Sequence, residues 1–226
     1  AKSADKVSAV GAIPVVDDLT KLSSNTEEAL AKCDFVLHSA AYMDLTYEKK
    51  PFYEINVDAT KKLINLAEKN GISKFVYISA APVVPGSPIV NLTEAEAGKE
   101  LPKALYPKTK AIAERAVLKA NTSKFKTISL RPPAIWGPDN HHYDDLMQNV
   151  KNGKWRWIGG GNQILSTIHV KNLANAVMAA FDSDRGGEAY FVTDGDRRSV
   201  KHTFTKLLKA EGLDPGEKTL PRGDAL

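Results

Sequence analysis

Phe75-Val-Tyr-Ile-Ser79 and Tyr106-Pro-Lys-Thr-Lys110 are the two stretches of this sequence that decide its fold. The first is an apolar run with the length of a buried strand. The second opens a segment of helical period and places a phenol and an ammonium one turn apart on the same helical face. A phenol beside a cation is a general acid whose anion is stabilised, which suits proton exchange with a carbinol or carbonyl oxygen. The spacing alone is a weak signal, so its position after a buried strand carries the prediction.

Strand-like and helix-like segments alternate over most of the 226-residue chain. Apolar runs of strand length lie at 12–16, 35–37, 75–78 and 127–130, and segments of helical period lie at 25–32, 52–70 and 106–120. The strands are apolar on both faces, as parallel strands covered by helices are. This order predicts an α/β fold with a doubly wound, Rossmann-like parallel sheet.

After Gly137-Pro138 the predicted helices and strands become shorter and more polar. Strands are predicted at 164–168 and 189–193, and helices at 172–181 and 200–211. We therefore expect a sheet domain over residues 1–137 and a smaller region over residues 138–226. Parts near 164–182 are expected to return to the sheet domain.

Composition and charge are those of an ordinary globular protein. Hydrophobic residues make up 42% and charged residues 26%, and the net charge is +4. No basic run with interleaved aromatics predicts a nucleic-acid partner, and no spacing of ligand residues predicts a metal site. The single Cys33 excludes an internal disulfide and fits a reducing compartment. Since we find no apolar stretch of about 18 residues and no leader, we expect no membrane span and a cytoplasmic location.

Small and polar residues follow each predicted strand. These segments are 17–20, 38–42, 79–82 and 131–134. Ligands of doubly wound sheets bind at the carboxyl ends of the strands, and small side chains allow the backbone to approach a flat cofactor. Tight turns have a similar composition, but four such segments around one Tyr–Lys pair favour a ligand site.

These motifs resemble the extended short-chain dehydrogenase/reductase superfamily, of the NAD(P)-dependent epimerase/dehydratase type. The resemblance covers most of residues 10–200, and its 3β-hydroxysteroid dehydrogenase-like branch is most similar at 157–161, 166–173 and 187–193. It implies NAD or NADP as the cofactor and an enzyme that interconverts a secondary alcohol and a ketone by hydride transfer. The substrate would be a hydrophobic hydroxy or keto compound, bound mainly by residues 138–226.

The resemblance assigns roles to individual residues. Tyr106 would exchange the proton with the substrate oxygen, while Lys110 would lower the pKa of the phenol and hold the nicotinamide ribose. Further cofactor contacts are expected from Asp18, Leu19, Ser39, Ala40, Ala41, Asn56, Ser79, Pro133, Ala134 and Ile135, and substrate contacts from Tyr42, Met43 and Ala81.

A homodimer is the expected assembly. The stripes of the helices at 52–70 and 106–120 look long enough to leave apolar surface after packing on the sheet. In the resembled family these two helices pair with their twofold mates, and a symmetric dimer is the commonest closed assembly.

The two ends of the chain depart from the family pattern. The superfamily opens with a strand and a glycine-rich loop whose amides bind the pyrophosphate at a helix N-terminus. Here Gly11 stands alone, so we expect the first β-α-β unit to be missing from the printed chain, together with the residue that selects NAD or NADP. The chain also ends, at Leu226, before the usual substrate domain would.

The third departure is chemical. Most relatives carry Ser or Thr immediately after the position aligned with Ser79, and this chain has Ala80 there. Loss of one oxyanion donor can lower the rate by about two to three orders of magnitude. Ser79, a neighbouring hydroxyl or a water could replace that donor, or Ser79 could itself be the equivalent residue.

Two other functions fit the same residues. A nucleotide-sugar epimerase or dehydratase would use the same scaffold and would need cations for a diphosphate, for which Lys151, Lys154 and Arg156 are available. A non-catalytic NAD(P)-binding sensor would explain Ala80. Net formation of NAD(P)H from secondary alcohols separates the oxidoreductase from both.

Overall fold

The computed structural model describes residues 3–44, 48–85, 91–96, 100–138 and 140–224. It divides the chain into two compact units, Ala1–Pro132 with Asn175–Val192, and Pro133–Ala174 with Thr193–Leu226. The first boundary falls before the expected one at residue 137. The segment that returns to the first unit, Asn175–Val192, overlaps the expected range of 164–182 and extends beyond it to include a strand of the sheet.

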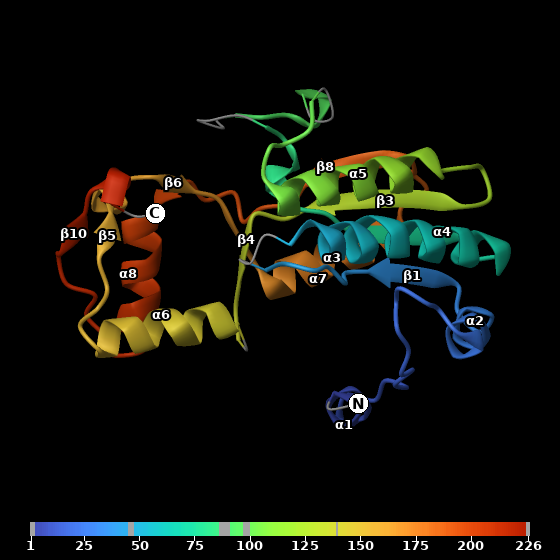
Figure 1. The fold of residues 1–226 in the computed structure, drawn as a ribbon, viewed down its shortest axis with the longest axis horizontal. Coiled ribbons are helices and arrows are strands. Elements are labelled where there is room, and N and C mark those ends of the chain that lie inside the picture. Colours follow the sequence, from blue (N-terminus) through green and yellow to red (C-terminus); the bar gives the residue numbers. More distant parts are fainter. Residues whose placement is uncertain (1–2, 45–47, 86–90, 97–99, 139, 225–226) are drawn as a thin grey trace. The chain divides into compact units, whose positions relative to one another are not determined.

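The first unit is built on a four-stranded parallel sheet (Figure 1). Its strands are β1 (Phe35–His38), β2 (Lys74–Ile78), β3 (Lys126–Arg131) and β8 (Glu188–Phe191), in the order β1-β2-β3-β8. In register, His38 lies beside Tyr77, and Arg131 lies beside Phe191. All four carboxyl ends therefore meet at one edge of the sheet.

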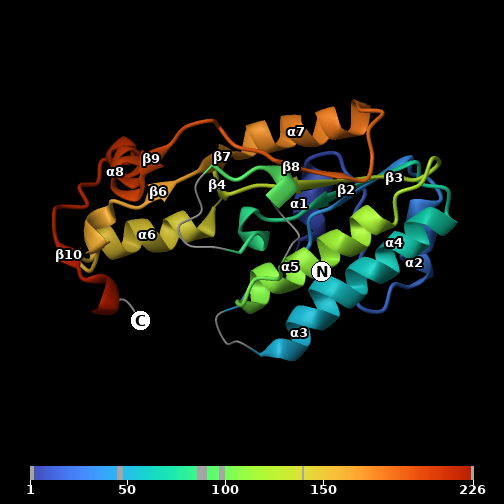
Figure 2. The ribbon, with the colours of Figure 1, turned by 90° about the horizontal axis from the view of Figure 1, so that it is seen from above.

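Helices cover both faces of this sheet, as Figure 2 shows from above. On one face lie α3 (Lys49–Tyr53), α4 (Thr60–Lys69) and α5 (Leu105–Lys119), and on the other lies α7 (Val170–Asp182). The first layer packs Leu63, Ile64 and Val117 against Phe75, and the second packs Val177 and Ala180 against Val76 and Ile128. The doubly wound, Rossmann-like α/β fold is confirmed.

The predicted helix at 52–70 is longer and less regular than its periodicity indicates. It runs from Lys49 to Lys69 and contains a π-helical segment at Glu54–Ala59. Gly71, with φ of 76°, follows its C-terminus as expected. Single π turns inside α-helices occur frequently at functional sites, and this one contains the buried Asn56.

The predicted strand at 12–16 is wrong. The segment has no strand structure, and its apolar side chains are exposed, with Ile13 at 89%. Among the described residues no strand pairs with the outer edge of β1, so nothing there provides hydrogen bonds for an extended segment. Local apolarity alone was therefore insufficient to form a strand.

The helices at 52–70 and 106–120 keep half-buried apolar side chains after packing on the sheet, but no fully exposed ones. Among the described residues, none of the large hydrophobic side chains of these helices is exposed. The exposed ones lie elsewhere, for example at Phe35 and Leu37 on the edge strand β1.

The remaining elements of the first unit are short. Helix α1 (Ala4–Ala9) buries none of its residues, and α2 (Ser24–Leu30) begins after Ser23, whose hydroxyl accepts the amide hydrogen of Asn25. Short 3₁₀ turns lie at Ala81–Val83 and Glu94–Glu96.

The described residues of the second unit form three two-stranded sheets. β4 (Ala134–Trp136) pairs with β7 (Thr167–His169), β5 (Trp157–Ile158) with β10 (Thr219–Leu220), and β6 (Ile164–Leu165) with β9 (Arg198–Ser199). The helices are α6 (His141–Lys151) and α8 (Val200–Ala210), and 3₁₀ turns lie at Gly159–Gly161 and Arg222–Asp224. The single strand predicted at 164–168 is split, because β6 and β7 pair with different partners.

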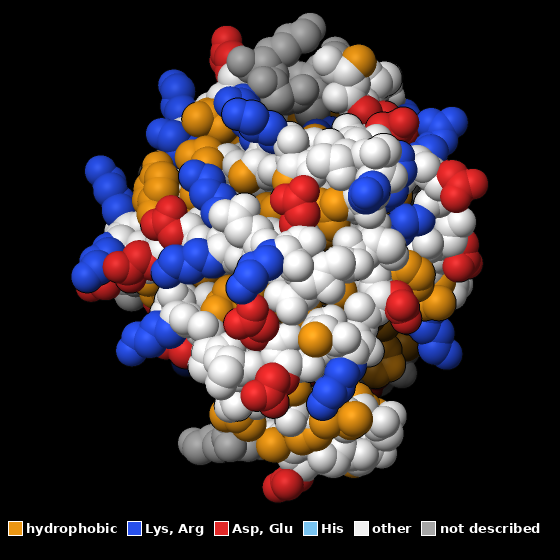
Figure 3. All heavy atoms as spheres, turned by 90° about the vertical axis from the view of Figure 1, so that its right-hand side faces the viewer, with side chains coloured by type: hydrophobic (Ala, Val, Ile, Leu, Met, Phe, Trp, Pro, Cys, Tyr) orange, Lys and Arg blue, Asp and Glu red, His pale blue; other side chains and the backbone are white. Residues whose placement is uncertain are grey.

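The surface carries charges of both signs. On the face shown in Figure 3, Lys and Arg side chains are interspersed with Asp and Glu, and apolar side chains form small patches. Along the described ranges, none of the helices is both long and apolar enough to cross a membrane.

Candidate functional site

A row of buried polar side chains lies at the carboxyl edge of the sheet, on the face covered by α5. Helix α5 contributes Tyr106, Lys110 and Glu114, each one turn after the one before it and on the same helical face. The strands contribute Tyr77 from β2 and Arg131 from β3. The predicted Tyr–Lys pair therefore lies where the sheet binds ligands.

Lys110 is almost fully buried, with 1% of its surface exposed. Its Nζ donates a hydrogen bond of 2.6 Å to the carbonyl of Ile78 and lies 4.2 Å from the centre of the Tyr77 ring. Burial lowers the pKa of Lys110 from 10.5 to about 7, and the carboxylate of Glu114 opposes this shift. The pKa of Lys110 is therefore close to neutral pH, so its side chain can be a cation or a neutral amine there.

Tyr106 is half-buried and packs against an apolar cluster that includes Ala80, Val83 and Ala111. Burial raises the pKa of its phenol above the usual 10.0. The expected lowering of this pKa by Lys110 is not found, because removal of the phenolate from water is the dominant effect. Tyr106 is thus a neutral phenol at neutral pH, as a proton donor requires.

Ser79 and Ala80, which directly follow β2, have different surroundings. Ala80 belongs to the apolar cluster that contacts Tyr106, and it is extended with φ of −155°. The Ser79 hydroxyl is buried and has no hydrogen-bond partner among the described residues, and the same holds for the phenol oxygen of Tyr77. Unpaired buried hydroxyls are unfavourable unless a ligand or a water supplies the partner.

Asn56 joins two of the predicted site segments. Its side-chain oxygen accepts the amide hydrogen of Tyr42 at 2.6 Å, and its Nδ2 donates to the Tyr42 carbonyl at 3.0 Å. The same Nδ2 donates at 3.0 Å to Thr109, whose hydroxyl bonds the first turn of α5 at Leu105 and Tyr106. Asn56 therefore fixes the loop after β1 relative to the Tyr106 helix.

His38 ends β1 beneath this loop. Its Nε2 lies 2.8 Å from the Thr60 hydroxyl, which also donates to the Asn56 carbonyl. Burial, and secondarily the charge of Lys110, lowers the pKa of His38 to about 4, so the ring is neutral at pH 7. Because Thr60 uses its hydrogen on Asn56, we assign the imidazole hydrogen to Nε2.

The other predicted cofactor and substrate residues are less closely grouped. Ser39, Ala40 and Ala41 are exposed directly after β1, and Met43 is exposed beyond Tyr42. Ala81 opens the 3₁₀ turn after Ala80. Pro133, Ala134 and Ile135 belong to the second unit, where the last two are part of β4.

Asp18 and Leu19 lie in the turn before α2. The Asp18 carboxylate accepts hydrogen bonds from the amide and hydroxyl of Thr20, which lower its pKa. Leu19 packs against the core cluster that contains Leu30. Leu19 also lines a groove along β1 with residues such as Leu22 and Phe35, and Ser39–Ala41 do not line it.

Sequence reasoning missed four residues that shape the site: Thr60, Thr109, Glu114 and the ring of Tyr77. Of these, only Glu114 could have been found from the sequence, because it continues the four-residue spacing of Tyr106 and Lys110.

The residues present fit the nicotinamide and ribose half of a dinucleotide cofactor. Small exposed side chains follow β1, and the Ser79 and Tyr77 hydroxyls need partners at the same edge. Lys110 has three N–H donors, of which Ile78 accepts one. The pyrophosphate half has no matching motif, since the 226 residues contain no G-x-G-x-x-G loop.

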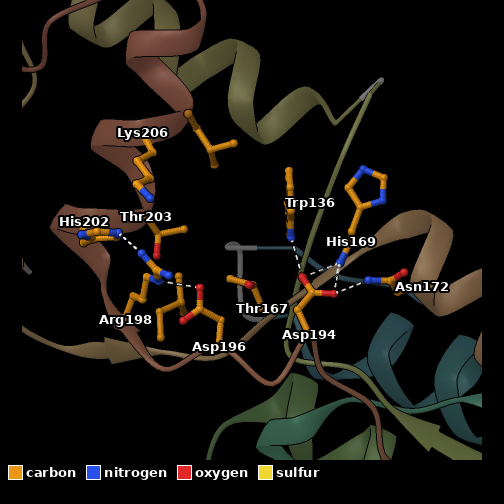
Figure 4. Close-up of a pocket in the computed structure, with 12 residues that line it drawn as sticks. Trp136, Thr167, His169, Asn172, Asp194, Asp196, Arg198, His202, Thr203 and Lys206 are labelled. Carbon is orange, nitrogen blue, oxygen red and sulfur yellow. Dashed lines mark hydrogen bonds and ion pairs between the residues drawn. The ribbon is translucent and has the colours of Figure 1, made fainter.

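The second unit contains its own pocket of about 350 Å³ (Figure 4). The Asp194 carboxylate organises one side by accepting hydrogen bonds from the Trp136 indole, the His169 amide and the Asn172 side chain. The other side is formed by α8 and by Arg198, which pairs with Asp196 and His202. Of the tryptophans, Trp136 lines this pocket whereas Trp157 is core.

Comparisons with known proteins agree with this geometry. Residues 1–222 match the 3-beta hydroxysteroid dehydrogenase/isomerase family. The chain is 32% identical, over 97% of its length and 66% of the relative, to the 4-hydroxy-2-methyl-3-oxo-4-farnesyl-3,4-dihydroquinoline-1-oxide ketoreductase of Stigmatella aurantiaca. It is also 32% identical, over 92% of its length and 65% of the relative, to a decarboxylating sterol-4-alpha-carboxylate 3-dehydrogenase of Dictyostelium discoideum.

A solved structure shows the shared fold. The UDP-glucuronic acid 4-epimerase of Bacillus cereus, in complex with NAD, matches with a TM-score of 0.82 at 17% identity, covering 96% of this chain and 73% of that one. The chain spans just under two thirds of the length of the two curated relatives described above. Since the family match covers nearly all of its residues and the fold agrees, the chain belongs to the 3-beta hydroxysteroid dehydrogenase/isomerase family.

Proposed function

We propose that this protein is an NAD(P)-dependent oxidoreductase that interconverts a secondary alcohol and a ketone. The observation that carries the proposal is the pairing of a neutral phenol, Tyr106, with a buried cation, Lys110, on one face of α5 at the carboxyl edge of the sheet. The names of the two relatives, a ketoreductase and a 3-dehydrogenase, support a hydrophobic hydroxy or keto substrate.

In this proposal Tyr106 donates its proton to the carbonyl oxygen during reduction, and takes it back during oxidation. Lys110 stabilises the phenolate that forms and holds the ribose. The nicotinamide, when bound, supplies or accepts the hydride. The family resemblance assigns Ser39–Ala41, Asn56, Ser79, Asp18, Leu19 and Pro133–Ile135 to the cofactor, and Tyr42, Met43 and Ala81 to the substrate.

The direct test is a panel of secondary alcohols offered with NAD⁺ and with NADP⁺. Net formation of reduced cofactor with at least one hydrophobic alcohol supports the proposal. Turnover of nucleotide sugars without net reduced cofactor would instead identify an epimerase, the activity named for the Bacillus cereus neighbour.

The position of Ala80 favours one rival function, an NAD(P)-binding sensor without turnover. Ala80 contacts the cluster around Tyr106 but offers no hydrogen-bond donor from its side chain. A sensor would bind the cofactor and show no oxidation or reduction with any member of the panel.

Restoring the hydroxyl tests whether Ala80 is the missing donor. We expect Ala80→Ser to leave kcat unchanged or raise it, by up to about 100-fold, because one well-aimed oxyanion donor has an effect of that size. The matched variant Ser79→Ala should stay within a few-fold of wild type. Steady-state reduction of one reactive ketone with both reduced cofactors measures both, and loss of activity in Ser79→Ala alone would show that Ser79 is the true donor.

We also infer a homodimer and a cytoplasmic location. The helices at 49–69 and 105–119 carry half-buried apolar side chains, including Ile55, Leu66, Ile112 and Leu118, and these could pair across a twofold axis. Light scattering at micromolar concentration should give twice the chain mass. A monomer mass would refute the dimer and leave the catalytic proposal unaffected, since Tyr106 and Lys110 lie on one helix.

A further inference from the structure

We propose that Glu114, held by Arg131 and Ser129, is the positioning residue that fixes Lys110, and with it the Tyr106 face of α5, at the carboxyl edge of the sheet. The inference rests on the role proposed above for Lys110. It goes beyond that role because neither Glu114 nor Ser129 is among the residues assigned to the substrate or the cofactor.

The geometry is that of a fully buried ion pair. Glu114 and Arg131 are each 4% exposed. Arg131 donates to Glu114 Oε1 from Nη2 at 2.7 Å and to Oε2 from Nε at 2.9 Å, and the Ser129 hydroxyl adds a bond of 2.8 Å to Oε2. Planar two-point pairing of this kind fixes orientation as well as distance.

This arrangement joins α5 to one strand end. Ser129 and Arg131 are two residues apart on β3, so their side chains share the face toward α5. The guanidinium also lies 5.3 Å from the ring of Phe191, which is the register partner of Arg131 on β8. We name these three residues, Glu114, Arg131 and Ser129, the α5–β3 brace.

The brace also sets the charge around Lys110. The titratable groups next to Lys110 are Tyr106 and Glu114 on α5, Tyr77 on β2 and His38 on β1, and Arg131 on β3 pairs with Glu114. His38 is neutral at pH 7, because burial lowers its pKa, and the two phenols are neutral because burial raises theirs. Within this set the Glu114 carboxylate is the counter-charge, and it favours the protonated form of Lys110 in a site where burial favours the neutral amine.

The test compares three charge-removing variants in the cofactor-free protein. Glu114→Gln removes the anion, Arg131→Gln removes the second cation, and the double variant removes both. The pKa of Lys110 is measured by a pH titration of its ¹³Cε NMR signal, assigned from the spectrum of Lys110→Arg. We expect a decrease of about one pH unit in Glu114→Gln, an increase in Arg131→Gln, and a value near wild type in the double variant.

A purely structural brace gives a different pattern, in which stability falls but the pKa of Lys110 does not move in opposite directions. If Glu114→Gln does not fold, the Arg131→Gln and double variants still decide, because the double variant removes the anion and the cation of the ion pair together. An unchanged Lys110 titration in all folded variants would overturn the proposal.

Kinetics then separate this inference from the proposed function. If Lys110 acts in catalysis, the alkaline limb of kcat/KM should shift in the same direction as the NMR titration. The kcat of Glu114→Gln should also fall about tenfold or more, with a smaller change in KM, because misplacement of a reacting group affects chemistry more than binding. Opposite NMR shifts without any turnover would support the brace and refute the oxidoreductase.

Discussion

Replacing Tyr106 with phenylalanine should lower kcat at least about 100-fold, the effect of losing a general acid. Phenylalanine keeps the ring that packs against Ala80, Val83 and Ala111, so the fold and the apolar cluster should survive. Cofactor affinity should stay within a few-fold, because the phenol oxygen is assigned to the substrate. Steady-state kinetics together with fluorescence titration of NADH and NADPH measure the two quantities separately.

Tyr143→Phe is the matched control for this variant. Tyr143 is another half-buried phenol whose pKa is raised by burial, but it lies on α6 in the second unit. It should retain nearly full kcat. Ordinary turnover by Tyr106→Phe would remove the proton-transfer role from the only Tyr–Lys pair with a spacing of four residues in the sequence.

Lys110→Met should give the second large effect. It should lower the activity and raise the stability of the protein. Activity should fall by at least about 100-fold, because the phenolate loses its cation and the ribose loses its donor. The cofactor-free protein should nevertheless become more stable at pH 6 by at least about 1 kcal/mol, because a buried charge is replaced by an apolar side chain of similar length. The pairing of Glu114 with Arg131 remains, so no new unpaired charge is created.

The pH dependence of this stability difference follows from the lowered pKa of Lys110. Below pH 7 the lysine is charged in both the folded and the unfolded chain, and the folded state is destabilised by desolvation. Between pH 7 and 10.5 the unfolded chain binds the proton that the folded chain has released, so the wild type gains stability as pH rises. Lys110→Met lacks this gain, so its advantage should shrink between pH 6 and pH 9.

Urea unfolding at those two pH values measures the difference. Lys119→Met is the control, because Lys119 is exposed at the end of α5 and should change stability little at either pH. A Lys110→Met variant that is less stable than wild type at pH 6 would show that the bond to Ile78 and the contact with Tyr77 outweigh the cost of burying the charge.

The sheet and its helices were predictable because the sequence patterns that indicate them lie within each element. The strands at 35–37, 75–78 and 127–130 and the helix at 106–120 appear within one or two residues of the predicted bounds, since continuous apolar runs and helical stripes report burial directly. The prediction of a strand at 12–16 was wrong because strand formation does not depend on local sequence alone. A strand also needs a neighbour, and an apolar run contains no information about which strand lies beside it.

The site was predictable only in part. The Tyr106–Lys110 pair lies within a single helical turn, so the spacing in the sequence sets the spacing in space. The Asn56 bonds to Tyr42 and Thr109 join segments far apart in the chain, and the Glu114–Arg131 pair joins a helix to a strand. No periodicity reports such contacts. The sign of the pKa shift at Tyr106 was also missed, because it depends on burial in three dimensions.

Transfer of a labelled hydride tests the central claim most directly. The protein is incubated with a hydrophobic ketone and, separately, with NADH and NADPH that carry deuterium at the nicotinamide C4 on one or the other face. The proposed function predicts a secondary alcohol that carries one deuterium on its carbinol carbon from one of the four labelled cofactors, and almost none of this product with Tyr106→Phe. Tight cofactor binding without deuterated alcohol from any hydrophobic ketone tried would contradict the oxidoreductase and leave the epimerase and the sensor as the functions to test.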